Sequence, residues 1–172
     1  MICDAHTHFF SPGFFEFFAR QVAGKRGGDF SVAELSRETG LEVPDSIPAL
    51  ADRWVEEMDR HEIECMVTIA SVPGDQASVL EAAARHPERL IPYAMFHPTA
   101  GGSVAALNAA AGEGLLGVCL FPAMQHVSMD DPEVLAFVEA AAGHGLIVFV
   151  HFGILKLGIR DKLGLPSPFD LR

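Results

Sequence analysis

Two histidines near the N-terminus, His6 and His8, have the residue type and the spacing of metal ligands. In a β-strand, residues i and i+2 point to the same side, so a strand ending here would aim both imidazoles at one point. Neutral imidazoles are good ligands for zinc and similar ions. Because the chain contains 8 histidines, the pair alone is a weak signal. Its meaning depends on where the strands end.

A third histidine, His151, ends the apolar run 146–151. In α/β barrels, functional side chains gather at the C-terminal ends of the parallel strands. A single buried histidine would be interpreted as a hydrogen-bonded core residue. A histidine that ends one strand, in a chain where His6 and His8 end another, favours metal ligation. We therefore predict that these three histidines hold one divalent metal ion.

The elements that must position these residues alternate between strand and helix. Alternation of this kind is typical of parallel βαβ units, in which each helix crosses over between neighbouring strands. The sequence therefore predicts an α/β fold with a parallel sheet. The strand-like runs lie at 2–6, 64–70, 90–96, 115–121 and 146–151, and the helical patterns at 48–61, 75–85, 103–111 and 132–142.

The segment at about 9–47 interrupts this alternation, since βα loops usually have about 2–6 residues. It opens with clustered phenylalanines, among them Phe9 and Phe14, and continues through a glycine-rich basic turn that contains Lys25 and Arg26. Long loops in compact α/β domains often contact substrate. We expect a loop or lid insertion, with Phe9 and Phe14 as substrate contacts. The alternative is that the phenylalanines only pack the segment onto the rest of the domain, and that the basic residues are solvated.

The net charge and the cysteine content limit which partners and which cellular compartment are expected. With 12 Lys and Arg against 23 Asp and Glu, the net charge is −11, which argues against a nucleic-acid or anionic-membrane partner. The start of the chain has no secretory pattern, and the apolar stretch 134–155 is interrupted by polar residues and glycines. Three cysteines, Cys3, Cys65 and Cys119, are an odd number without metal-site spacing. We therefore expect no disulfide framework and a reducing, cytoplasmic compartment.

Several stretches occur together in a specific order: DAHTHFF, RWVEEMDRHEIECMVTIAS, EAAARHPERLIPYAMFHP, and GLLGVCLFP followed by GLIVFVHFG. They resemble the amidohydrolase superfamily, in particular the amidohydrolase-related branch that contains aminocarboxymuconate-semialdehyde decarboxylase and related metal-dependent hydrolases. The resemblance implies a (β/α)₈ TIM barrel. It also implies that His6, His8 and His151 bind one divalent ion, commonly zinc.

The same resemblance implies two functional positions that this sequence does not contain. Family members have a histidine ending strand six and an aspartate ending strand eight, and both would lie beyond Arg172. The catalytic residues are therefore unknown. A complete barrel has about 250 residues, so residues 1–172 are interpreted as one incomplete barrel with about five of the eight strands. We expect an exposed edge on the fifth strand, and a chain that is poorly soluble or pairs with a partner such as a second copy.

Other positions at strand ends are weaker candidates. Relatives with two metals have a lysine in strand four, whereas this chain has Cys119 there, which we interpret as packing. His97 and Phe121 follow strands three and four and would face the mouth of the barrel, so we include them as substrate contacts. A solvated loop residue is the alternative for His97. His126, in the loop after strand four, is interpreted as a surface residue.

These observations predict a metal-dependent hydrolase or non-oxidative decarboxylase. The expected substrate is a small carboxylated and partly apolar molecule, and a metal-activated water would be the reactive group. Two alternatives remain. The chain is a non-catalytic fragment or remnant of such a barrel, or it is a metal-dependent phosphoesterase, because a His-X-His motif also opens phosphoesterase domains.

Overall fold

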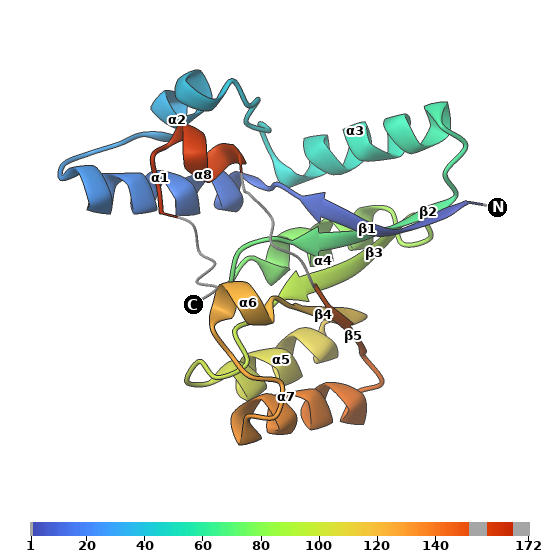
Figure 1. Cartoon of the computed structure of the whole chain (residues 1–172). Coiled ribbons are helices and arrows are strands. Elements are labelled where there is room, and N and C mark those ends of the chain that lie inside the picture. The colour runs from blue at the N-terminus through green and yellow to red at the C-terminus, as the bar shows by residue number, and fades with distance from the viewer. Residues whose placement is uncertain (1, 152–157, 167–172) are drawn as a thin grey trace.

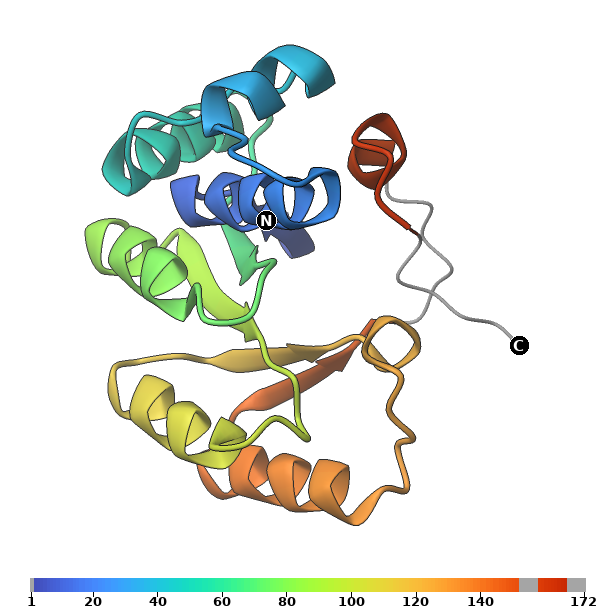
Figure 2. The same ribbon diagram turned by 90° about the vertical axis from the view of Figure 1, so that its left-hand side faces the viewer.

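The computed structural model describes residues 2–151 and 158–166. Within them, five strands form one sheet in the order β1-β2-β3-β4-β5, and every neighbouring pair is parallel. The sheet curls into a half-barrel (Figures 1 and 2), which confirms the predicted incomplete (β/α) barrel. The strands are β1 (Cys3–Phe9), β2 (Cys65–Ala70), β3 (Leu90–Met95), β4 (Gly117–Leu120) and β5 (Ile147–Val150).

Crossover helices cover the outer face of the sheet, as Figure 2 shows. Their bounds agree with the sequence periodicity to within one residue at each end. Local capping explains this agreement, since Ser46 accepts a hydrogen bond from the Ala49 amide and Asp131 accepts one from the Glu133 amide. The helices are α3 (Ile47–Arg60), α4 (Gln76–Arg85), α5 (Ser103–Gly112) and α7 (Pro132–Gly143).

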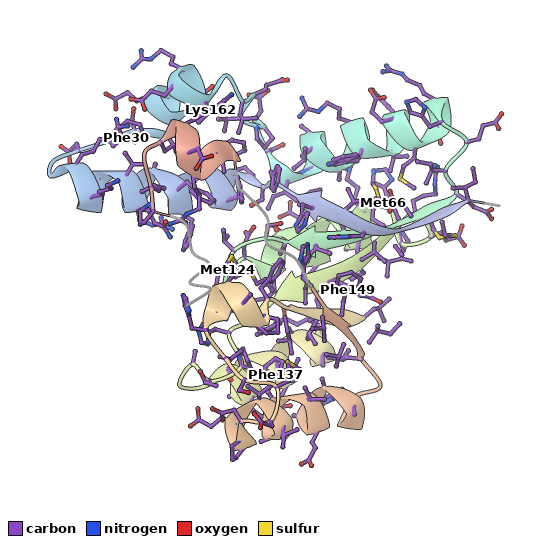
Figure 3. All side chains as sticks on the ribbon, viewed as in Figure 1. Phe30, Met66, Met124, Phe137, Phe149 and Lys162 are labelled. Atoms are coloured by element: carbon purple, nitrogen blue, oxygen red, sulfur yellow. A yellow bond between two sulfur atoms is a disulfide. The ribbon has the colours of Figure 1, made fainter. Side chains whose placement is uncertain are left out.

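The main core lies between these helices and the sheet. Met66 of β2 and Phe137 of α7 are both fully buried in it (Figure 3). Nearly every position of β2, β3 and β4 is buried, as expected for parallel strands that are covered on both faces. A second apolar cluster fills the concave inner face and includes Tyr93 and Cys119.

The segment at about 9–47, predicted to be a loop or lid insertion, is largely helical. It contains α1 (Pro12–Arg26) and α2 (Val32–Thr39), and each helix begins at a serine that caps its first turn. Helix α1 continues through Lys25 and Arg26, so the glycine-rich turn begins only at Gly27, which has φ 73°. The run of adjacent phenylalanines hides the helical period, because both faces of α1 carry aromatic rings.

Two short helices were not predicted, α6 (Pro122–Gln125) and α8 (Gly158–Lys162). Helix α8 lies beside α1 and α2 (Figure 1), although it is far from them in sequence. Lys162 donates to the Thr39 carbonyl at 2.7 Å, and Leu163 and Leu165 are buried with the phenylalanines of α1. We call α1, α2 and residues 158–166 the cap.

A disulfide joins Cys3 of β1 to Cys65 of β2, which contradicts the expectation that no disulfide forms. Strand pairing explains it, because these residues are register partners with Cα atoms 4.7 Å apart. Spacing along the chain does not reveal such a pair. The disulfide removes the argument for a reducing compartment. Cys119 is buried, and this burial raises the pKa of its thiol to about 12, in keeping with a packing role.

The two ends of the sheet are β1 and β5, and within the described ranges no further strand pairs with either of them. Ile147, at the start of β5, keeps 60% of its surface exposed. No helix in the described part of the chain is both long enough and apolar enough to span a membrane.

Candidate metal centre

His6, His8 and His151 come together although their strands lie at opposite ends of the sheet. The ring centroids of His6 and His151 are 4.9 Å apart, and those of His8 and His151 are 5.7 Å apart. The curl of the sheet brings β1 and β5 toward each other across its concave face. The His151 amide donates to the Leu120 carbonyl at 2.8 Å, which holds this residue at the end of β5.

The nitrogen atoms of these three histidines have the spacing of metal ligands. One ring nitrogen from each lies within 4.8 Å of the others. The Nε2 atoms of His6 and His8 are 3.1 Å apart, and two nitrogens on a tetrahedral zinc are about 3.3 Å apart, given Zn–N distances of about 2.0–2.1 Å. His151 Nε2 is buried without a hydrogen-bond partner among the described residues. Since an orphaned buried nitrogen is costly, a cation between the rings fits this arrangement.

Ser71, directly after β2, orients the ring of His8. Its Oγ lies 2.9 Å from His8 Nδ1 and donates its hydrogen to the Ile69 carbonyl at 3.0 Å. A hydroxyl has one hydrogen, so toward His8 it can only accept. The proton of neutral His8 must then be on Nδ1, and Nε2 presents its lone pair toward His6 and His151.

An irregularity in the pairing of β1 and β2 coincides with His6. Asp4 pairs with Met66 and Thr7 with Thr68, so β1 has one extra residue between them. The Asp4 carboxylate accepts a hydrogen bond from the His6 amide at 2.9 Å within this stretch. Bulges re-aim side chains and are common beside functional sites. Here the bulge lies where the side chains of His6 and His8 converge.

The sequence matches the amidohydrolase family over residues 3–169. The chain belongs to this family. Among curated proteins, none matches the sequence. The stretch GLIVFVHFG, the last of those that resemble the family, ends in Phe152 and Gly153. These two residues lie outside the described residues.

Two solved structures have the same fold as this amidohydrolase. One is a probable 2-pyrone-4,6-dicarboxylic acid hydrolase from Acinetobacter baumannii with citric acid bound, at 17% identity and a TM-score of 0.52, covering 88% of this chain and 49% of that one. The other is a 4-oxalomesaconate hydratase from Rhodopseudomonas palustris, at 18% identity and a TM-score of 0.62, covering 88% of this chain and 52% of that one. The amidohydrolase chain thus spans about half the length of these enzymes.

Burial favours the neutral form of two histidines of the amidohydrolase, His8 and His151. It is the largest cause that lowers the pKa of His8 to about 4, and repulsion from His6 and then His151 adds to it. The pKa of His151 is also lowered, mainly by burial and then by His6. Both rings therefore keep a free nitrogen lone pair at neutral pH, and only this form binds metal.

A cavity of about 420 Å³ adjoins His8 and lies between the cap and the ends of β2, β3 and β4. Three of the four predicted substrate contacts, Phe14, His97 and Phe121, line it. The Phe121 ring also stacks on His151, with centroids 4.5 Å apart. The fourth, Phe9, is fully buried in the main core and does not line the cavity. Because consecutive strand residues face opposite sides, Phe9 points outward where His8 points inward.

The wall of the cavity also contains residues that sequence reasoning did not select as substrate contacts. His126 is exposed, as predicted, and it also lines the cavity, in a left-handed backbone conformation with φ 54° that ends α6. Met124 of α6 (Figure 3) and Arg160 of α8 also line it and were not predicted. Arg26 of the basic segment does not line the cavity and pairs with Glu38 through two hydrogen bonds of 2.8 Å. No local pattern indicated Arg160, because the cap brings it to the cavity.

Proposed function

We propose that His6, His8 and His151 bind one divalent metal ion, with zinc as the first candidate, and that this site serves a hydrolase or a non-oxidative decarboxylase. The observation that carries the proposal is the unpartnered, buried Nε2 of His151 facing two further imidazoles. Strand four contributes buried Cys119 rather than a lysine, which supports one metal rather than two. When bound, a divalent ion supplies Lewis acidity, which polarises a substrate oxygen and acidifies water.

The residues of the chain itself then perform four tasks. The histidines hold the ion, and Ser71 sets the tautomer of His8. Phe121 covers one face of His151 and limits access of water to it. His97, which lies at the wall of the cavity, can donate or accept a hydrogen bond on a substrate held beside His8.

The cavity favours a small substrate with an apolar body and a carboxylate. Phenylalanines and methionines make up much of its wall, and its volume of about 420 Å³ lies within the usual range of about 300–1,000 Å³ for small-molecule sites. A carboxylated substrate is in line with one of the similar structures, whose name specifies a dicarboxylic acid and which holds citric acid.

A non-catalytic role is the second candidate, and one observation favours it. Among the described residues, no carboxylate joins the three histidines, so the site has ligands but no evident general base. In that case the chain would bind metal without turning over any substrate.

The test combines metal content with turnover. The purified chain of residues 1–172 is dialysed against zinc, and bound metal is measured for the wild type, His8→Ala and His151→Ala. The same samples are offered aromatic esters, amides, carboxylic acids and phosphate esters, with product and CO₂ release recorded. We expect about one zinc per wild-type chain and turnover that His8→Ala abolishes. Retained activity in His8→Ala would exclude the metal role, zinc binding without turnover would favour the non-catalytic role, and turnover of phosphate esters alone would indicate a phosphoesterase.

A further inference from the structure

The cavity differs in charge from the rest of the molecule. The chain has a net charge of −11, yet among the described residues that line the cavity none is Asp or Glu. The one Lys or Arg among them is Arg160 of α8. The described wall of this apolar cavity thus contains a guanidinium and no carboxylate, although the protein as a whole is acidic.

Arg160 is held in place but only partly used by the protein. Its Nε donates to the Pro166 carbonyl at 2.9 Å, and its Nη1 donates to Gln21 Oε1 at 3.1 Å. A guanidinium has five N–H groups, so three have no hydrogen-bond acceptor among the described residues. Within the same residues, no carboxylate forms an ion pair with it. Burial lowers the pKa of Arg160, which reflects the cost of a charge that water and counter-ions reach only in part.

Most other polar groups in the wall are already occupied. The Gln125 amide accepts from the Phe121 backbone and donates to the Phe96 carbonyl. Ser71 is committed to His8 and Ile69. A ligand in the cavity would therefore meet the aromatic rings of α1, the imidazoles of His97 and His126, and the free N–H groups of Arg160.

We propose that Arg160 binds the carboxylate of an aromatic monocarboxylic acid whose ring packs among the phenylalanines of α1. The proposal rests on the function proposed above, because it defines the substrate class of the same site. A planar guanidinium matches a carboxylate with two parallel hydrogen bonds. The aromatic rings Phe14, Phe17 and Phe18 supply the apolar wall next to it. A second carboxylate would find no second Lys or Arg among the described wall residues.

The test compares an acid with its neutral amide. Binding of 3-phenylpropionate and 3-phenylpropionamide to the full chain is measured by calorimetry or ligand-observed NMR, before and after zinc addition. A charge-assisted pair contributes about 1.5–3 kcal/mol, so we expect the acid to bind about 10- to 100-fold more tightly than the amide. Arg160→Gln should remove this preference and leave amide binding unchanged. Arg20→Gln, which removes an exposed arginine of α1 paired with Glu16, should leave both affinities unchanged.

Three results would overturn the proposal. The first is an acid preference that survives in Arg160→Gln, and the second is a wild type that binds acid and amide equally. The third is tighter binding of benzylmalonate, a dicarboxylate with the same ring. If Arg160→Gln does not fold, Met124→Trp replaces it: filling the cavity should abolish binding of both ligands, and unchanged binding would again overturn the proposal. Because acid preference is measured without turnover, it can hold when zinc binding fails, and zinc can bind when the preference fails.

Discussion

Ser71 fixes the tautomer of His8 by accepting a hydrogen bond from its Nδ1 at 2.9 Å while donating to the Ile69 carbonyl at 3.0 Å. One side chain at the end of β2 thereby directs a lone pair at the end of β1. Residues that orient a metal ligand in this way typically contribute 10- to 100-fold to metal affinity, as an order of magnitude. The site therefore extends one layer beyond its three histidines.

The first prediction concerns this hydrogen bond. Ser71→Ala should weaken zinc binding by about 10- to 100-fold, because His8 can then rotate or carry its proton on Nε2. Competition with a chromophoric chelator measures the affinity. Ser71→Thr keeps the hydroxyl and should retain most of it, and Ser36→Ala, which removes a hydroxyl from the cap, is the matched control. Equal affinities for Ser71→Ala and the wild type would show that Ser71 does not orient His8.

The second prediction uses the unpartnered Nε2 of His151. His151→Phe keeps a ring stacked on Phe121 and removes the buried nitrogen. The metal-free variant should be as stable as the wild type or more stable, because an orphaned polar atom is lost. Zinc at 100 times its Kd should stabilise the wild type by about 2.7 kcal/mol and leave the variant unchanged. Thermal melting with and without zinc measures both effects, and a zinc-dependent rise in the Tm of the variant would contradict the ligand assignment.

The third prediction concerns pH and the ion pairs of Asp52. Hydrogen bonds from Arg85 and then His86 lower the pKa of its carboxyl from 3.8 to about 2. The unfolded chain then binds the proton more tightly, so the stabilisation is present above pH 4 and is lost as the pH falls toward 2. Asp52→Asn should lower the free energy of unfolding at neutral pH, and its difference from the wild type should shrink below about pH 4. Urea unfolding at several pH values tests this. Asp29→Asn, at an exposed position, is the control.

The fourth prediction concerns close packing in the concave face. The Tyr93 ring lies over Gly117, where an added Cβ would come within 2.5 Å of ring carbons. Gly117→Ala should therefore lower the free energy of unfolding by about 1–3 kcal/mol. Gly24→Ala, inside α1 with open space around the new Cβ, should instead stabilise by about 0.5–1 kcal/mol. Denaturant titrations compare the two variants, and similar values for both would show that the Tyr93 contact does not govern position 117.

The fifth prediction concerns the disulfide. Cys3 and Cys65 are 62 residues apart in sequence, and a loop of that size corresponds to a stabilisation of up to about 4 kcal/mol in the chain-entropy model. Reduction of the disulfide, or Cys3→Ser, should lower the free energy of unfolding by an amount up to this limit. Thiol titration of the denatured oxidised chain should find only Cys119 reactive, whereas three reactive thiols would show that the bond does not form. Cys119→Ala leaves the bond intact and is the control.

Much of the architecture follows from local sequence patterns. Apolar runs and helical periodicity located five strands and four crossover helices, because burial on both faces of a parallel strand and on one face of a helix leaves a short-range pattern. The convergence of His6 and His8 was also predictable, since alternation along a strand puts both on one side. The same alternation, applied one residue further, would have excluded Phe9 from the cavity.

Other features depend on contacts between distant segments. The pairing of Cys3 with Cys65 depends on the register between β1 and β2. The arrival of Arg160 at the cavity depends on how α8 packs against α1 and α2. Neither contact can be predicted from the spacing of residues along the chain. The helical nature of α1 was hidden because its aromatic side chains serve both the cap and the cavity.

The sequence by itself determined the element order, the parallel class of the sheet and the three histidines, because each depends on periodicity within a few residues. Only the tertiary structure decided that His151 meets His6 and His8, which lie on the opposite edge strand of the sheet. It also decided that the guanidinium of Arg160, which forms no ion pair among the described residues, faces an apolar cavity. The physical reason is that the curvature of the sheet and the packing of the cap bring together residues that are far apart in sequence. Periodicity within a few residues does not predict such contacts.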